Sequence, residues 1–146
     1  MICIDANVVV VPFIPGPSSQ QASTLLADSE SAQLTIVAPP FLPIEVTNVI
    51  RRTMLQTGQS IREAQDLLER FFLLPITLVA PDGLYAEAPA IAHRYRLPGV
   101  YDAHYLAVAE LYQCPFWIDG RRVLRSLGGK APHVHWIGEY AGNLAP

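Results

Sequence analysis

Five short apolar runs constrain the fold of this 146-residue chain more than any other feature. They are continuous rather than alternating, and they occupy residues 1–4, 34–38, 76–80, 115–118 and 133–137. Such runs are typical of strands buried on both faces, and strands that alternate with helices form parallel sheets. The sequence therefore predicts an α/β fold, a three-layer α/β/α sandwich with a mainly five-stranded parallel sheet and its last strand at an edge.

Helical periodicity and capping signals fill most of the intervals between these runs. Residues 8–19 are rich in proline and glycine and predict a loop, after which Ser18 or Ser19 can cap a helix. Ser60 and Glu63 have the spacing of a capping box. The predicted helices cover residues 20–29, 42–57, 60–72, 82–95, 100–112 and 121–127. On the third of these, Arg62, Asp66 and Arg70 are spaced for ion pairs on a solvated face.

Composition limits the chain to one core and excludes a generally basic surface. Apolar residues make up 51% of the sequence and charged residues 16%, which predicts a single domain over residues 1–146. The net charge of −3 means that nucleic acid would be bound by local patches only. Cys3 and Cys114 lack a CxxC spacing and are expected to be free buried thiols, although a disulfide is the alternative. No apolar run reaches the ~18 residues of a membrane span and no leader is recognisable, so we expect a cytoplasmic protein.

Four acidic residues stand at strand ends or helix starts. Asp5 follows the first strand and Asp119 the fourth, while Glu45 and Asp102 lie near the starts of helices. In a parallel sheet these positions meet at one edge, near the switch point in strand order. Each aspartate could instead cap a helix or a turn, but Glu45 borders the apolar stripe of its helix. Four converging carboxylates repel one another, and Mg²⁺ or Mn²⁺ would offset that repulsion.

Four stretches that contain these acids resemble the four acidic motifs of the PIN domain, and in particular of VapC-type toxins from toxin–antitoxin pairs. The stretches are IDANVVV, IEVTNVI, YDAHYLAVAE and WIDGRRVL, in that order and at about the usual spacing. The resemblance covers nearly the whole chain. It implies cleavage of single-stranded RNA that depends on Mg²⁺ or Mn²⁺, a homodimer, and inhibition by an antitoxin protein.

The same resemblance implies a role for each acid. Asp5, Glu45 and Asp102 would be the core acids of the metal site, with Asp119 as the fourth. Asn7 matches a polar position that supports the first aspartate.

Three features depart from the family pattern. Trp117 stands where the family usually has Thr or Ser, two residues before the fourth acid. The first helix is expected to be short or irregular, because its residues are β-branched or proline. Basic residues are sparse, and the candidates for holding RNA phosphates are Arg121, Arg122 and Arg125, which equally fit a solvated helix face.

Other aromatic and histidine residues have structural interpretations beside functional ones. His133 and His135 could share a zinc ion but suit a polar edge strand better, and His104 suits a helix surface. Tyr101, Tyr105 and Tyr112 could stack on bases, although core packing is the simpler interpretation, as it is for Trp117.

Two other function classes use a similar scaffold. A catalytically silent PIN-like module would keep the fold and bind only a protein partner. Receiver domains have a tandem acidic pair after the first strand, and haloacid dehalogenase-type phosphatases have a DxD motif. The stretch CIDAN supplies one acid there, which argues against both.

Overall fold

The sheet forms the centre of the protein, for which a computed structural model describes residues 1–14, 16–142 and 144. All its strands are parallel, and their order is β3-β2-β1-β4-β5. The strands are β1 (Ile2–Ile4), β2 (Ile36–Ala38), β3 (Ile76–Leu78), β4 (Phe116–Ile118) and β5 (Val134–Trp136). The predicted five-stranded parallel sheet is thus confirmed, with β5 at an edge.

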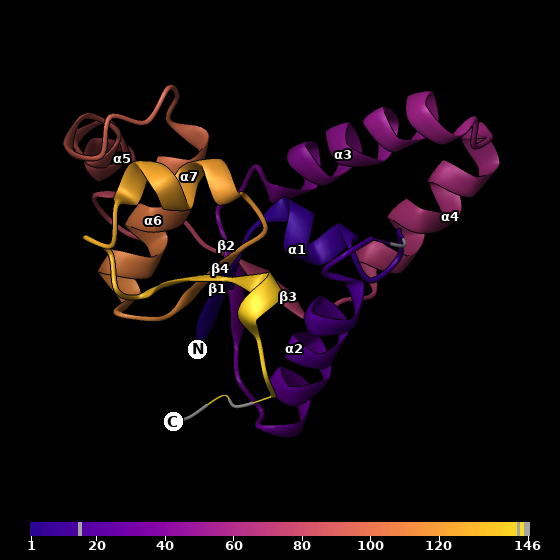
Figure 1. The fold of residues 1–146 in the computed structure, drawn as a ribbon, viewed down its shortest axis with the longest axis horizontal. Helices are drawn as coiled ribbons and strands as arrows, with labels where there is room; N and C mark the ends of the chain where they lie inside the picture. Colours follow the sequence, from indigo (N-terminus) through magenta and orange to yellow (C-terminus); the bar gives the residue numbers. More distant parts are fainter. Residues whose placement is uncertain (15, 143, 145–146) are drawn as a thin grey trace.

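Helices cover both faces of the sheet and make the predicted three-layer α/β/α sandwich (Figure 1). One layer consists of α1 (Ala6–Val10), α2 (Ser19–Ser31), α3 (Leu42–Thr57) and α4 (Ile61–Phe72). The other layer consists of α5 (Leu84–Arg94), α6 (Tyr101–Tyr112) and α7 (Arg121–Leu127), and a 3₁₀ turn, η1 (Ile137–Glu139), follows β5. Among the described residues, no helix is long and apolar enough to cross a membrane.

The strand order reverses between β1 and β4, which places a switch point at the middle of the sheet. Cys3 pairs with Phe116 and Ile4 with Trp117 across this junction. Because the two strands are parallel and in this register, Asp5 and Asp119, which follow them, both lie at the carboxyl ends of the strands. Ligands bind preferentially at such a switch point, outside the carboxyl ends of the strands.

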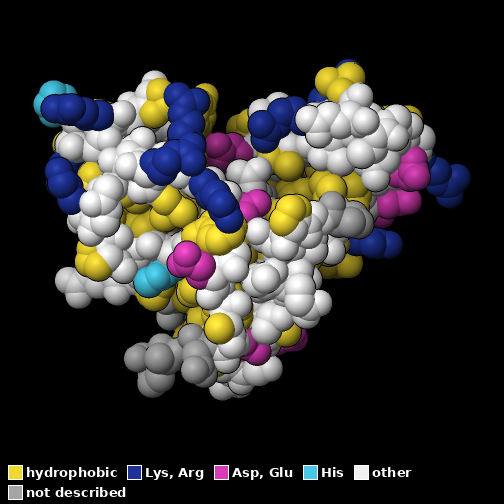
Figure 2. All heavy atoms as spheres, viewed as in Figure 1, with side chains coloured by type: hydrophobic (Ala, Val, Ile, Leu, Met, Phe, Trp, Pro, Cys, Tyr) yellow, Lys and Arg dark blue, Asp and Glu magenta, His cyan; other side chains and the backbone are white. Residues whose placement is uncertain are grey.

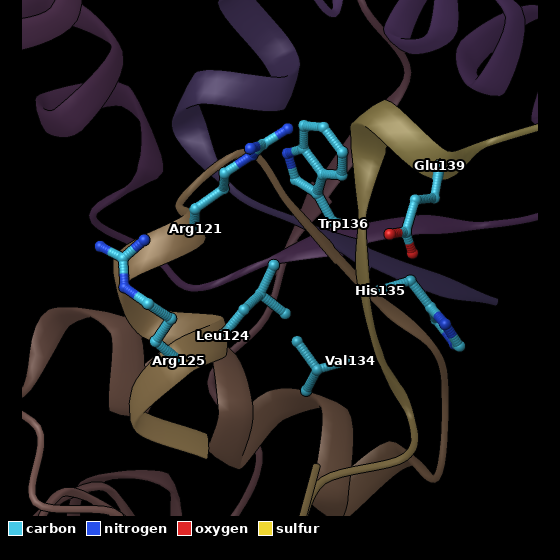
Figure 3. Close-up of a pocket in the computed structure, with 7 residues that line it drawn as sticks. All are labelled: Arg121, Leu124, Arg125, Val134, His135, Trp136 and Glu139. Carbon is cyan, nitrogen blue, oxygen red and sulfur yellow. The ribbon is translucent and has the colours of Figure 1, made fainter. Parts of the chain in front are cut away.

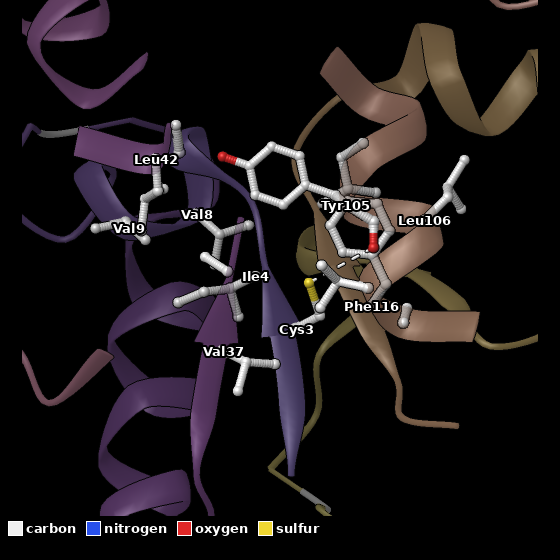
Figure 4. Packing of buried hydrophobic residues seen from close by; sticks show 14 of the residues in the cluster. Cys3, Ile4, Val8, Val9, Val37, Leu42, Tyr105, Leu106 and Phe116 are labelled. Carbon is white, nitrogen blue, oxygen red and sulfur yellow. Dashed lines mark hydrogen bonds between the residues drawn. The ribbon is translucent and has the colours of Figure 1, made fainter. Parts of the chain in front are cut away.

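The core lies on both sides of β1 (Figure 4). Cys3, Ile4, Val8, Tyr105 and Phe116 are fully buried there, and the rings of Tyr105 and Phe116 stack with centroids 5.6 Å apart. Burial of each such aliphatic or aromatic side chain contributes roughly 1.5–3 kcal/mol. This packing fixes the positions of the strand ends that carry the candidate site.

The segment after Asp5 differs from the predicted loop. Residues 6–10 form α1, a helix of five residues, and Val8, Val9 and Val10 are buried. β-branched residues have a low helix propensity, and here burial of the valines in the core compensates for it. The expectation of a short first helix is confirmed. The prediction of a loop from residue 8 was wrong for residues 8–10, which belong to α1.

Other local features agree with the sequence in part. The Ser60–Glu63 capping box is present, whereas the Ser18 side chain forms no cap hydrogen bond with α2. Cys3 and Cys114 are free and buried, as expected. The predicted ion pairs of α4 are absent, since the one salt bridge found among the described residues joins Arg94 and Glu110. The third strand was expected to be covered on both faces, but β3 is largely exposed.

Candidate active site

Asp5 is both the N-cap of α1 and a buried carboxylate. Its Oδ1 accepts a hydrogen bond from the backbone N–H of Val8 at 2.7 Å, and the residue is only 5% exposed. Burial raises the pKa of this carboxyl from 3.8 to about 7, and the hydrogen bond from Val8 only partly opposes that rise. The capping role therefore satisfies one oxygen without neutralising the charge, so a cation beside Asp5 would be stabilising.

Glu45 lies in the first turn of α3, where Tyr105 of α6 holds it. The Tyr105 hydroxyl donates a hydrogen bond to Oε2 of Glu45 at 2.6 Å. Burial raises the pKa of Glu45, with a smaller increase from the charge of Asp102. The hydrogen bond from Tyr105 and the charge of Arg52 act in the opposite direction. Tyr105 is thus a core residue, as predicted, and its hydroxyl also orients one of the candidate acids.

Asp102 lies in the first turn of α6 but does not cap it, because the N-cap is Val100. The residue is half-buried, and burial raises the pKa of its carboxyl while the charge of Arg122 lowers it. The capping interpretation of Asp102 was therefore wrong, and its carboxylate is available to a ligand.

These three carboxylates line one small cavity, which we call the acid cavity. Asp5, Glu45 and Asp102 come from three separate elements and enclose a volume of about 70 Å³. The cavity is polar, and Figure 2 shows acidic side chains in a hollow between the arm of α3 and α4 and the rest of the molecule. Asn7, Asn48, Arg52 and Tyr105 also line it.

Sequence reasoning missed Asn48 and Arg52. They follow Glu45 by three and seven residues, a spacing that places all three on one face of α3. That spacing was the signal that could have identified them.

Asp119 lies beside the acid cavity without lining it. Its Oδ1 accepts hydrogen bonds from Ser18 Oγ at 3.0 Å and from Trp136 Nε1 at 3.4 Å. Its charge contributes to the raised pKa of Asp5, so the two carboxylates interact. The N-cap of α7 is Gly120, which excludes Asp119 as a cap. Ser18 and Trp136 were not predicted as partners, because their contacts with Asp119 join residues far apart in the sequence.

The chemistry of these groups suits a hard divalent cation, but they do not form a ready-made cage. Among the described residues, no group of three or more His, Cys, Asp and Glu side chains could hold a metal ion. Mg²⁺ typically keeps several waters and is bound by one or two carboxylates, so it does not need such a cage. For all three carboxyls, burial raises the pKa more than any neighbouring group lowers it, and such carboxylates fit this kind of ligand.

The three candidate arginines of α7 are all exposed, and they differ in what they face. Arg121 packs its guanidinium over the indole of Trp136, and Arg125 lines a neighbouring groove. The positive charge of Arg122 lowers the pKa of Asp102. Asn7 contributes a hydrogen bond that lowers the pKa of Asp5, and the supporting role implied for it stays a prediction.

The remaining aromatic predictions have mixed outcomes. Tyr101 and Tyr112 are 64% and 39% exposed, so assigning them to the core was wrong. Trp117 is half-buried, and its ring lies 4.9 Å from that of His135 and 5.1 Å from that of Tyr140. His104 is half-buried against Phe41 rather than freely exposed.

Comparison with known proteins gives one family. A search of curated proteins found no match. The family model for the PIN domain matches residues 2–125, which include Asp5, Glu45, Asp102 and Asp119. The chain therefore belongs to the PIN domain family, whose members are generally nucleases.

Proposed function

We propose that this protein is a metal-dependent endoribonuclease that cleaves single-stranded RNA, and that it is the VapC-type toxin of a toxin–antitoxin pair. The observation that carries the proposal is the acid cavity, where Asp5, Glu45 and Asp102 meet although they are far apart in the sequence. Structural ion pairs would supply counter-charges to such acids. Here burial dominates, and it raises the pKa of all three carboxyls.

In this proposal Asp5, Glu45 and Asp102 hold Mg²⁺ or Mn²⁺ directly or through water, and Asp119 adjusts the site from its edge. A bound ion of this kind lowers the pKa of a coordinated water and neutralises charge on a phosphoryl group.

The protein's own side chains contribute positioning. Tyr105 orients Glu45, and the N–H of Val8 orients Asp5. Arg52 and Arg122, which lower the pKa of Glu45 and Asp102, are placed to attract the RNA phosphate beside these acids. Hydrolysis would leave a 5′-phosphate and a 3′-hydroxyl.

The toxin role, the antitoxin partner, the homodimer and the cytoplasmic location rest on the resemblance of the four motifs. Large apolar side chains are exposed on α3 and α4, which is consistent with a protein partner. They are Ile44, Leu55, Ile61 and Phe72. Light scattering of the purified protein would test the homodimer.

The test of the activity is cleavage of a labelled single-stranded RNA with Mg²⁺, with Mn²⁺ and with EDTA. Asp5→Asn should lower the rate at least about 10²-fold, as expected when a preorganised group that stabilises charge is removed. Asparagine caps helices as well as aspartate does, so the fold should survive. Asp66→Asn on exposed α4 is the matched control and should cleave normally.

Cleavage that persists in EDTA or in Asp5→Asn would contradict the proposal. A folded protein that binds Mn²⁺ and cuts no RNA would favour the silent module instead.

A further inference from the structure

A second hollow of the surface is a groove of about 470 Å³ (Figure 3), and its lining includes Trp136, which donates to Asp119. It is bounded by α7, β5 and η1, and we call it the α7–β5 groove. Leu124 and Val134 supply apolar surface, and the remaining lining that matters here is Arg121, Arg125, Trp136 and Glu139. Its combination of a large aromatic ring, two guanidinium groups and apolar surface differs from the small acidic cavity beside it.

The indole of Trp136 is held in place by three separate contacts. The guanidinium carbon of Arg121 lies 3.9 Å from the ring centroid, and Nε1 donates to Asp119. Gly138 brings the backbone directly against the ring, because a Cβ at this position would lie 2.3 Å from Cζ2 of the indole. The half-buried ring is thus covered by the Gly138 backbone and by Arg121, and it holds the exposed guanidinium of Arg121 in a fixed plane.

We infer that the α7–β5 groove binds one nucleotide of single-stranded RNA, next to the nucleotide that lies at the acid cavity. This inference rests on the proposed function and adds a binding subsite to it. The base stacks on the outer face of the Arg121 guanidinium, whose inner face rests on the indole of Trp136, since nucleobases stack on guanidinium planes. Arg125 binds the phosphate, for which a guanidinium is well suited.

Charge gives the bound nucleotide a direction. Glu139 repels phosphate and its carboxylate can accept from the N–H groups of a base, so the base edge faces Glu139 and the phosphate faces Arg125. Figure 2 shows basic side chains running over α7 towards acidic side chains in the hollow. An RNA strand following these basic groups passes from the groove to the acid cavity by way of Asp119.

An acidic protein segment is the competing occupant. It would use the charges of Arg121 and Arg125 but would gain little from a fixed indole. The stacked pair therefore favours RNA, and charge and stacking can be separated by experiment.

The first experiment measures binding of a fluorescent single-stranded RNA in EDTA, where metal-dependent cleavage cannot occur. Trp136→Leu and Gly138→Ala should each weaken binding about tenfold, as expected for the loss of one stacked base. Arg121→Lys keeps the charge and loses the planar stack, so it should weaken binding similarly without disturbing the core. Arg62→Ala, which removes an exposed arginine from distant α4, should bind like the wild type.

The second experiment uses tryptophan emission, because the chain has only Trp117 and Trp136. In Trp117→Phe, a short RNA should change the emission of Trp136, whereas polyphosphate, which has charge but no bases, should not.

Wild-type RNA affinity in Arg121→Lys and Trp136→Leu would overturn the subsite while leaving the nuclease intact. If Arg121→Ala combined with Arg125→Ala instead abolished binding of polyglutamate and left RNA binding unchanged, the groove would belong to an acidic protein partner. A wild-type protein that neither binds nor cleaves RNA would overturn both this inference and the proposed function.

Discussion

The acid cavity and the α7–β5 groove hold charged side chains in opposite environments, and Asp119 interacts with a residue of each. In the cavity, Asp5 and its neighbours are withdrawn from water, and burial raises their pKa values. In the groove, Arg121 and Arg125 are exposed, and Arg121 rests on the ring of Trp136. Arg52 lines the cavity but does not offset this burial, so a metal ion would be stabilising there, whereas the groove offers its cations to an anionic ligand. A strand of RNA whose phosphate meets a metal ion would need both.

The largest expected effect concerns the stability of the metal-free protein. The pKa of Asp5 is about 7 in the folded protein and near the ordinary 3.8 in the unfolded chain. The folded state thus binds this proton more tightly, so its stabilising contribution is complete below about pH 4 and is lost as the pH rises to about 7. The difference between the folded and unfolded pKa of Asp5 corresponds to about 4 kcal/mol of unfolding free energy. The raised pKa values of Glu45 and Asp102 change the stability in the same direction.

Urea denaturation in EDTA between pH 4 and 8 measures this loss. Asp5→Asn should remove most of the pH dependence, and Mg²⁺ should stabilise the wild type more at pH 8 than at pH 5. A free energy of unfolding that stays level from pH 4 to 8 would contradict the view that the buried, ionised Asp5 destabilises the metal-free protein.

The second prediction tests whether Glu45 depends on its orientation. Tyr105→Phe removes the hydroxyl that donates to Glu45 and keeps the ring that stacks on Phe116. Mn²⁺ affinity should fall about tenfold, as for other partners that orient a metal ligand. Stability should fall by about 1 kcal/mol. Calorimetric titration with Mn²⁺ is the measurement, and Tyr112→Phe on the exposed end of α6 is the control. Equal affinities in both variants would show that the hydrogen bond is purely structural.

The third prediction concerns the cations of the groove. Each phosphate contact to a single strand contributes roughly 0.7 to the slope of log affinity against log salt concentration. Arg125→Ala should therefore flatten the slope by about 0.7 when RNA binding is measured over a salt series, whereas Arg121→Lys, which keeps its charge, should leave the slope unchanged. An unchanged slope in Arg125→Ala would mean that this arginine contacts no phosphate.

The five strands and the three cavity acids followed from local sequence patterns. Continuous apolar runs identified the strands, and Asp5 was recognisable because it ends one of them. Glu45 stood out because it borders an apolar helical stripe. These signals are local. The residues they identify lie close together because the carboxyl ends of parallel strands are on the same side of the sheet.

The groove could not be predicted from the sequence, because it depends on contacts between residues that no local sequence pattern indicates. Trp136 lies in the predicted edge strand, and no local pattern in the sequence indicates that the backbone of Gly138 packs against its indole. Ser18 read as a helix cap but donates to Asp119, across 101 positions of sequence. α1 was missed in part because helix propensity does not include the burial of its valines.

The smallest expected effect comes from an ion pair whose side chains are both accessible to water. Arg94 and Glu110 approach to 3.2 Å, with side chains 51% and 27% exposed. Solvent and salt weaken such a pair, so Arg94→Ala should cost less than about 1 kcal/mol of stability. Thermal unfolding of Arg94→Ala, Glu110→Ala and the double variant gives the coupling between them. A coupling as large as the pH effect of Asp5 would contradict the view that burial, rather than charge as such, makes the acid cavity costly without a cation.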